Sequence, residues 1–280
     1  MEIQPISGAI GAEITGVDLA ALEVDEFAAL HKALLDYGVI SIHGQALTAD
    51  QQIAFARRWG AIHAHPYLSG LDGNPEIIEI VKEAGEPNRF GAHWHTDQVF
   101  TPAPAMATML LAREVPPVGG DTLFTDLYAA YDALSDGMKR MACRLRTVNT
   151  YDKGTTRSKR MGAKVLEPEK EAVPAVHPLV RVHPETGKRA LYINDTRIMR
   201  CFEDMTEAES KPLLDFFLTH ATRPEFTCRV RWQVGTLGLW DNRRLMHLAL
   251  DDYQGHRRVM HRITIKGTPT IGVDPSEFAT

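Results

Sequence analysis

The sequence predicts a mostly β fold with flanking helices, of the sandwich or barrel type. Many short apolar runs are bounded by Gly, Pro, Asn or Asp, whereas only a few segments repeat apolar residues at helical spacing. Neither pattern recurs at a fixed interval, which argues against a repeat protein. Closed β architectures of about this length commonly form one domain, so we expect a single domain over residues 1–280.

Three helices are predicted, over residues 22–37, 48–59 and 206–220. Two of them begin with a capping box. In this motif the threonine and the residue three positions later each accept, through their side chains, a hydrogen bond from the backbone N–H of the other. The pairs are Thr48 with Gln51 and Thr206 with Glu209. Pro212 lies inside the last helix, where we expect it to cause strain or a kink because proline cannot donate a backbone hydrogen bond.

Short runs typical of strands cover residues 39–43, 76–82, 105–115, 173–182, 189–194 and 226–232. In the last run Phe226, Cys228, Val230 and Trp232 alternate with polar residues, which predicts one buried face. Residues 152–171 are rich in Lys, Arg, Gly and Glu and poor in large apolar side chains. That composition predicts a mobile surface loop, and less often an active-site lid.

Composition limits the partners and the location of the protein. The formal net charge of −5 gives no reason to expect nucleic acid or an anionic membrane as partner. The amino terminus lacks a basic segment followed by an apolar run, and no later stretch is long and uncharged enough to cross a bilayer. Three widely spaced cysteines favour buried thiols over disulfides. We therefore expect a cytoplasmic protein.

A candidate metal site begins with His95 and Asp97. In extended backbone, side chains two residues apart point to the same side, so the two could hold one ion. A third ligand from a distant histidine would complete the two-His-one-carboxylate set, which leaves open positions on iron(II) for oxygen chemistry. A competing pair, His183 and Glu185, is separated by a proline and precedes Thr-Gly, which favours a turn.

His247 and Arg258 near the carboxyl terminus make the metal-site interpretation of His95 and Asp97 more specific than a chance match. With twelve histidines in the chain, about one His-x-Asp is expected at random, whereas the order His95, Asp97, His247 and then an arginine eleven residues later is specific. Arg258 and Arg262 are four apart in a predicted strand and share one face. If that face is buried, both guanidinium groups need anionic partners, which the strand itself does not contain. Small carboxylates or sulfonates would pair with them in bidentate fashion.

The ordered set resembles the taurine/2,4-D (TauD/TfdA) family of iron(II)- and 2-oxoglutarate-dependent dioxygenases. The similarity begins at residues 11–19, includes residues 94–97 and 119–123, and closes with residues 240–242, His247 and Arg258. It implies a double-stranded β-helix (jelly-roll) core, Fe(II) held by His95, Asp97 and His247, and O2 as oxidant. It also implies that Thr122 and Arg258 bind the distal carboxylate of 2-oxoglutarate.

The resemblance also implies a small anionic substrate: a carboxylate, sulfonate or sulfate ester. Arg262 matches the position that binds the substrate's anionic group, and His65 aligns with a histidine that contacts sulfonate in the taurine enzymes. Gly91 stands where taurine recognition would use an asparagine. Residues 205–214 and 226–232 resemble the branch that acts on aryloxyalkanoates such as phenoxypropionates. We therefore expect hydroxylation of an aryloxyalkanoate followed by ether cleavage, with release of succinate and CO2.

Three alternatives stay open from the sequence. The first is a dioxygenase acting on taurine or another alkylsulfonate or alkyl sulfate. The second is a zinc hydrolase on the same barrel, whose activity would not depend on 2-oxoglutarate. The third is a binding or sensory protein with a degenerate site, although the presence of all three ligands argues against it. A homo-oligomer is compatible with each of these.

Overall fold

The computed structural model describes residues 1–63, 69–86, 91–151 and 173–278. Its largest sheet has seven strands, in the spatial order β1 (Glu2–Pro5), β2 (Ala12–Thr15), β3 (Val39–Ile42), β13 (Leu237–Asp241), β5 (Ala107–Glu114), β15 (Arg258–Ile265) and β4 (Ile78–Lys82). All neighbours in this sheet are antiparallel except β2 and β3, which run parallel.

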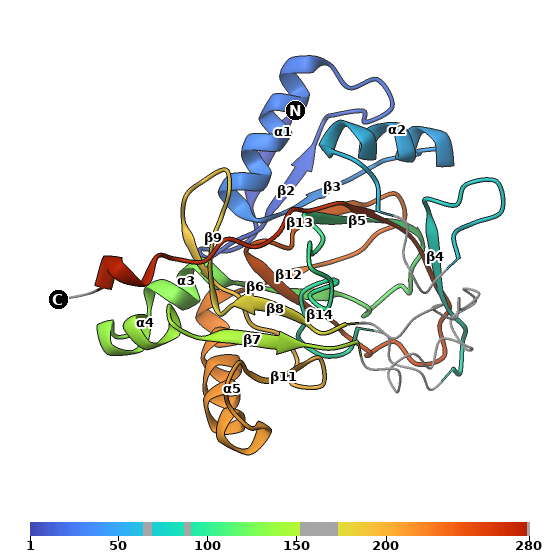
Figure 1. Cartoon of the computed structure of the whole chain (residues 1–280). Helices are drawn as coiled ribbons and strands as arrows, with labels where there is room; N and C mark the ends of the chain where they lie inside the picture. The colour runs from blue at the N-terminus through green and yellow to red at the C-terminus, as the bar shows by residue number, and fades with distance from the viewer. Residues whose placement is uncertain (64–68, 87–90, 152–172, 279–280) are drawn as a thin grey trace.

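Three smaller sheets complete the β structure. They comprise β12 (Thr227–Val230), β6 (Thr122–Asp126) and β14 (Leu245–Ala249); β11 (Met199–Phe202), β7 (Arg146–Asn149) and β8 (Ala175–Pro178); and β10 (Arg189–Leu191) with β9 (Val180–Val182). In Figure 1 the strands of the two three-stranded sheets lie on the opposite side of the large sheet from α1 and α2. The mostly β class with a jelly-roll core is thereby confirmed.

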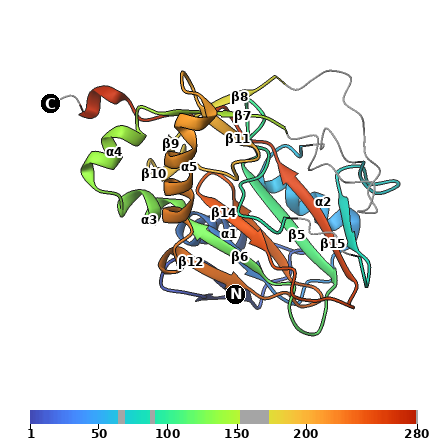
Figure 2. The same cartoon turned by 90° about the horizontal axis from the view of Figure 1, so that it is seen from below.

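Helices cover both sides of the β core. They are α1 (Val24–Tyr37), α2 (Ala49–Trp59), α3 (Leu127–Asp132), α4 (Asp136–Ala142) and α5 (Glu207–Ala221), with 3-10 turns at Pro224–Phe226 and Pro275–Phe278. α1 and α2 pack their apolar faces on β3, β13, β5 and β15 in one buried cluster. Figure 2 shows α5 beside the smaller sheets, where it packs with α3 in a second cluster. No helix in the described part of the chain is long and apolar enough to cross a membrane.

The local signals of the sequence are largely confirmed. Both capping boxes form, and the helices that they open begin one residue after Thr48 and Thr206. α5 runs unbroken through Pro212, so the proline does not end the helix. Pro212 is exposed there, which leaves solvent free to satisfy the carbonyl group that loses its helical donor. In β12 the predicted face is buried, with Cys228 4 % and Val230 1 % exposed.

One predicted strand is wrong in its extent. The run predicted over residues 173–182 contains two strands, which begin at Ala175, because the chain changes sheets at Leu179: β8 pairs with β7 and β9 pairs with β10. The predicted mobile loop at residues 152–171 lies outside the described residues. The expectation of a single domain stays a prediction.

Candidate metal centre

His95 and His247 face each other as a bridge between two distant parts of the chain. The backbone N–H of His95 donates to the carbonyl of His247 at 3.0 Å, and the reverse bond measures 2.8 Å. Residues paired in this way project their side chains to the same side of the ladder. The two imidazole rings accordingly lie with their centroids 4.1 Å apart.

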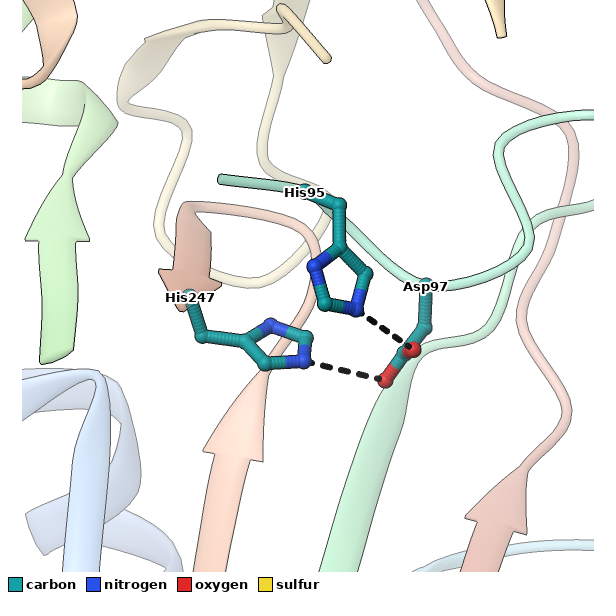
Figure 3. A group of neighbouring side chains, drawn as sticks. All are labelled: His95, Asp97 and His247. Atoms are coloured by element: carbon teal, nitrogen blue, oxygen red, sulfur yellow. Dashed lines mark ion pairs between the residues drawn. The ribbon is translucent and has the colours of Figure 1, made fainter. Parts of the chain in front are cut away.

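Asp97 completes the cluster from the loop that follows His95. Figure 3 shows its two carboxylate oxygens directed at the two imidazoles: Oδ1 lies 3.9 Å from His95 Nε2, and Oδ2 lies 4.0 Å from His247 Nε2. One donor atom from each residue lies within 4.8 Å of the other two. The sequence-predicted pair and its distant partner are therefore brought together, close enough to bind one ion at ordinary metal–ligand distances of about 2 Å with little adjustment.

The protonation states of the three side chains suit a cation. His95 Nδ1 lies 2.8 Å from the carbonyl of His93, so Nδ1 carries the proton and Nε2 presents its lone pair to the cluster. Burial lowers the pKa of both His95 and His247, which keeps them neutral. Burial alone would raise the pKa of Asp97, but the Arg262 guanidinium and the two imidazoles outweigh it and hold that pKa well below its usual range.

A pocket joins this cluster to most of the other predicted site residues. Gly91, His95, Thr122, His247, Arg258 and Arg262 all line it, together with apolar side chains that include Ile80, Leu110 and Trp240. Asp97 is not one of the lining residues, but its carboxylate lies within 4.0 Å of three of them, His95, His247 and Arg262. His65 lies outside the described residues, so its predicted contact stays a prediction.

Arg258 is a buried cation without a carboxylate partner among the described residues. It is 8 % exposed, and its Nε and Nη2 atoms have no hydrogen-bond acceptor in that part of the structure. Burial lowers its pKa. Its guanidinium lies 5.9 Å from the ring of Trp232, whose indole N–H donates to the Thr122 hydroxyl at 3.0 Å. Thr122 and Arg258 thus lie near one side chain, Trp232, and both line the pocket, where an anion would satisfy Arg258.

Arg262 has an acidic partner from outside its own strand. The sequence offered no acidic partner within the strand for either guanidinium group, but Arg262 Nη2 lies 2.7 Å from Asp97 Oδ1. Asp97 reaches this face from a loop that is remote in sequence, so Arg262 has a protein carboxylate as well as the pocket beside it. Arg262 is 7 % exposed and its Nε has no acceptor among the described residues, so it also retains capacity to bind an anion in the pocket.

Gly91 lies against the cluster in a conformation that favours glycine. Its φ is +69°, and a Cβ at this position would lie 3.4 Å from His95 Cε1. The backbone carbonyl of Gly91 accepts a hydrogen bond from Ala249, at the end of β14, at 2.9 Å. Any side chain here would therefore occupy pocket space beside the candidate metal ligand.

Several residues near the site carried no functional prediction. Thr108 donates to Asp97 Oδ2 at 2.7 Å. Lys82 lines the pocket, forms an ion pair with Asp251 and lies 4.1 Å from the centre of the Tyr253 ring. The spacing of these residues gave no signal, because their contacts join separate strands and loops.

The competing histidine is structural. His183 is fully buried and its Nε2 lies 2.9 Å from Asp241 Oδ2. Asp241 in turn accepts two hydrogen bonds from the Arg243 side chain. Residues 184–186 form a turn, in which the Gly187 N–H donates to the His183 carbonyl at 2.9 Å, so the interpretation of this segment as a turn is confirmed.

Comparisons with known proteins agree with this geometry. The family described as "Taurine catabolism dioxygenase TauD, TfdA family" matches residues 2–264. An alpha-ketoglutarate-dependent sulfate ester dioxygenase of Pseudomonas putida is 34 % identical over 98 % of this chain and 92 % of its own length. An (S)-phenoxypropionate/alpha-ketoglutarate-dioxygenase of Sphingobium herbicidovorans is 32 % identical over 96 % of both chains. The crystal structure of a taurine dioxygenase from Burkholderia xenovorans superposes with a TM-score of 0.84 and 35 % identity, covering 98 % of this chain and 93 % of the other.

The chain belongs to the TauD/TfdA family of dioxygenases. The protein is a 2-oxoglutarate-dependent oxygenase that uses Fe(II) and O2, and the cluster of His95, Asp97 and His247 fits that metal. The family predicted from the order of His95, Asp97, His247 and Arg258 in the sequence is thereby confirmed.

Proposed function

We propose that the protein hydroxylates a small anionic organic substrate at an Fe(II) centre held by His95, Asp97 and His247. One observation carries this proposal: His95 and His247 of the three-residue cluster line the same pocket as Arg258, a buried arginine whose Nε and Nη2 atoms have no acceptor among the described residues. The donor set by itself also fits zinc. An unpaired buried guanidinium is costly, however, and a dicarboxylate cosubstrate accounts for it where a hydrolase would not.

Arg258 and Thr122 bind the distal carboxylate of 2-oxoglutarate in this proposal. The planar guanidinium can donate two parallel hydrogen bonds to a carboxylate. The Thr122 hydroxyl accepts from Trp232, so its own proton is free for a second acceptor. The keto acid end of the cosubstrate then lies toward the metal ligands, because all of these groups line one pocket.

The residues of the chain supply position and a dry environment. When bound, Fe(II) with 2-oxoglutarate activates O2, so that one oxygen atom enters succinate as CO2 leaves and the other enters a C–H bond of the substrate. His95 and His247 remain neutral because burial opposes their protonation. Trp240, Leu110 and Ile80 form apolar walls that exclude water from the reacting centre.

Arg262 orients the substrate through its anionic group. Its side chain reaches both Asp97 and the pocket, so a bound carboxylate or sulfur oxyanion would lie close to the metal centre. We favour an aryloxyalkanoate, in line with the Sphingobium relative. If the hydroxylated carbon carries the ether oxygen, the new hydroxyl gives its proton to the departing phenol and a carbonyl group forms.

An alkyl sulfate or alkylsulfonate is the second candidate substrate. The Pseudomonas relative acts on sulfate esters, and the same hydroxylation beside the ester oxygen would release sulfate. Succinate release measured with phenoxypropionates, alkyl sulfates and taurine will rank these classes. Cytoplasmic location and homo-oligomer formation stay predictions.

Anaerobic protein mixed with Fe(II) and 2-oxoglutarate is expected to show a weak visible metal-to-ligand charge-transfer band. The band requires that the keto acid chelates the metal, so it tests the centre without any substrate. Absorption difference spectra will detect it, with protein plus Fe(II) alone as the control. Absence of the band at saturating Fe(II) and 2-oxoglutarate would contradict the roles assigned to the metal ligands and to Arg258.

Gly91→Asn is expected to raise the KM for phenoxypropionate by about 10-fold, because the added side chain takes pocket space beside His95. Asparagine tolerates a positive φ better than other side chains, which limits the backbone cost. Gly187→Asn is the matched control, since Gly187 has a φ of +68° and open space around its Cα. Equal KM values in the two variants would contradict a role for residue 91 in substrate selection.

A further inference from the structure

A row of three hydrogen bonds leads through the protein interior to Asp97. The indole N–H of Trp240 donates to Asn242 Oδ1 at 3.0 Å, and the Asn242 side-chain amide donates to the Thr108 hydroxyl at 3.0 Å. The Thr108 hydroxyl in turn donates to Asp97 Oδ2 at 2.7 Å. The last of these bonds ends on a candidate metal ligand.

The direction of every bond in this row is fixed by its two ends. An indole N–H can only donate, so the oxygen of the Asn242 amide faces Trp240 and its nitrogen faces Thr108. An ionised carboxylate can only accept, so the Thr108 hydroxyl must give its proton to Asp97. The hydroxyl thus has one donor behind it and one acceptor in front of it, and no second orientation satisfies both.

Burial and strand pairing restrict the motion of Thr108. Thr108 and Asn242 are both 0 % exposed, so water does not compete for their hydrogen bonds. Thr108 lies in β5 between β13 and β15, opposite Trp240 on one side and Thr264 on the other. Its side chain is β-branched, which restricts rotation about χ1. The hydroxyl therefore contacts Asp97 from a rigid part of the large sheet.

The two oxygens of Asp97 are held by different kinds of residue. Oδ1 accepts from Arg262, which lines the pocket and can exchange this contact for one with a bound anion. Oδ2 accepts from Thr108, which does not line the pocket. Only the bond from Thr108 is therefore independent of what the pocket contains. Without it, the carboxylate could turn and present both oxygens to one ion, which would use a position that oxygen chemistry needs.

We propose that Thr108 is a positioning residue, which fixes the carboxylate of Asp97 as a one-oxygen ligand and is itself oriented by Asn242 and Trp240. This inference rests on the proposed function, in which Asp97 binds the metal. Partners of this kind orient metal ligands, and their loss typically weakens metal binding by about 10- to 100-fold. Thr108 acts through Asp97 and does not touch substrate.

The test compares Co(II) binding to four full-length proteins: wild type, Thr108→Val, Thr108→Ser and Thr264→Val. Titration calorimetry gives the Kd, and visible absorption at saturating Co(II) reports the ligand arrangement. Thr108→Val keeps the shape and removes the hydroxyl, whereas Thr108→Ser keeps the hydroxyl. Thr264→Val is the matched control, because Thr264 is buried opposite Thr108 and its hydroxyl has no partner among the described residues.

Thr108→Val is expected to bind Co(II) about 10- to 100-fold more weakly, with an altered spectrum at saturation, while the other two variants match the wild type. A variant that was merely less stable would keep the wild-type spectrum once saturated. Wild-type affinity and spectrum in Thr108→Val would overturn the inference, as would equal losses in Thr108→Ser. If the wild type itself bound no Co(II), the proposed function would fall, and this inference with it.

Discussion

Asp97→Ala is expected to lose succinate production by more than about 100-fold, because removing a metal ligand should cost more than removing a residue that only orients one. The same substitution leaves Arg262 as a buried cation without its carboxylate. Breaking a buried ion pair in this way costs about 3 kcal/mol, so the metal-free variant should also unfold at a lower temperature. Coupled assay of succinate and calorimetric unfolding will measure the two effects separately.

Asp126→Ala separates the loss of a ligand from the loss of a buried charge. Asp126 is 6 % exposed and pairs with the buried Arg244 at 2.9 Å, but it does not line the pocket. Its replacement should lower stability by a similar amount and leave the Kd for Fe(II) unchanged in the folded protein. Full turnover in Asp97→Ala would remove Asp97 from the metal site.

Arg258→Leu is expected to raise the KM for 2-oxoglutarate by about 100-fold or more. Removing one partner of a buried charge pair costs about 3 kcal/mol, and each 1.4 kcal/mol is a factor of about ten. The effect on stability has the opposite sign from the usual one. Arg258 has no acceptor for its Nε and Nη2 atoms in the described structure, so leucine relieves an unpaired buried charge and should raise the Tm of the protein measured without cosubstrate.

Arg244→Leu is the matched control for that prediction. Arg244 is 3 % exposed, pairs with Asp126 and donates to the carbonyl of Leu35 at 2.9 Å. Its replacement should lower the Tm and leave the KM for 2-oxoglutarate unchanged. If Arg258→Leu instead lowered the Tm as much as Arg244→Leu does and kept the wild-type KM for 2-oxoglutarate, Arg258 would be a structural arginine and the cosubstrate site would lie elsewhere.

Local sequence signals predicted the elements that local interactions decide. The boxes at Thr48 and Thr206 set where two helices begin, because each box closes within four residues. The alternation in residues 226–232 predicted the buried face of β12, since the side-chain period of a strand is two. α3 and α4 were not predicted, because six and seven residues carry too little periodicity to be distinguished from loops.

Local sequence patterns failed to predict the structure where contacts between distant segments of the chain determine it. Leu179 ends one strand because the chain there leaves the partner β7 for the partner β10, and neither partner is adjacent in sequence. Pro212 is tolerated because its side of α5 faces solvent, which depends on how the helix packs. The role of Thr108 was equally hidden, since nothing in its neighbours along the chain marks a contact with Asp97.

The sequence by itself determined the chemistry of this protein. His95, Asp97 and His247 are the donor types that Fe(II) accepts, and their order with Arg258 is sufficient to identify the family. Only the tertiary structure decided which of these charges are paired. It brings Arg262 to Asp97 and gives Arg258 no carboxylate partner within the described part of the chain, although both arginines lie on one face of β15. The reason is physical: the free energy of a buried charge depends on the partners that the fold brings to it, and those partners come from remote parts of the chain.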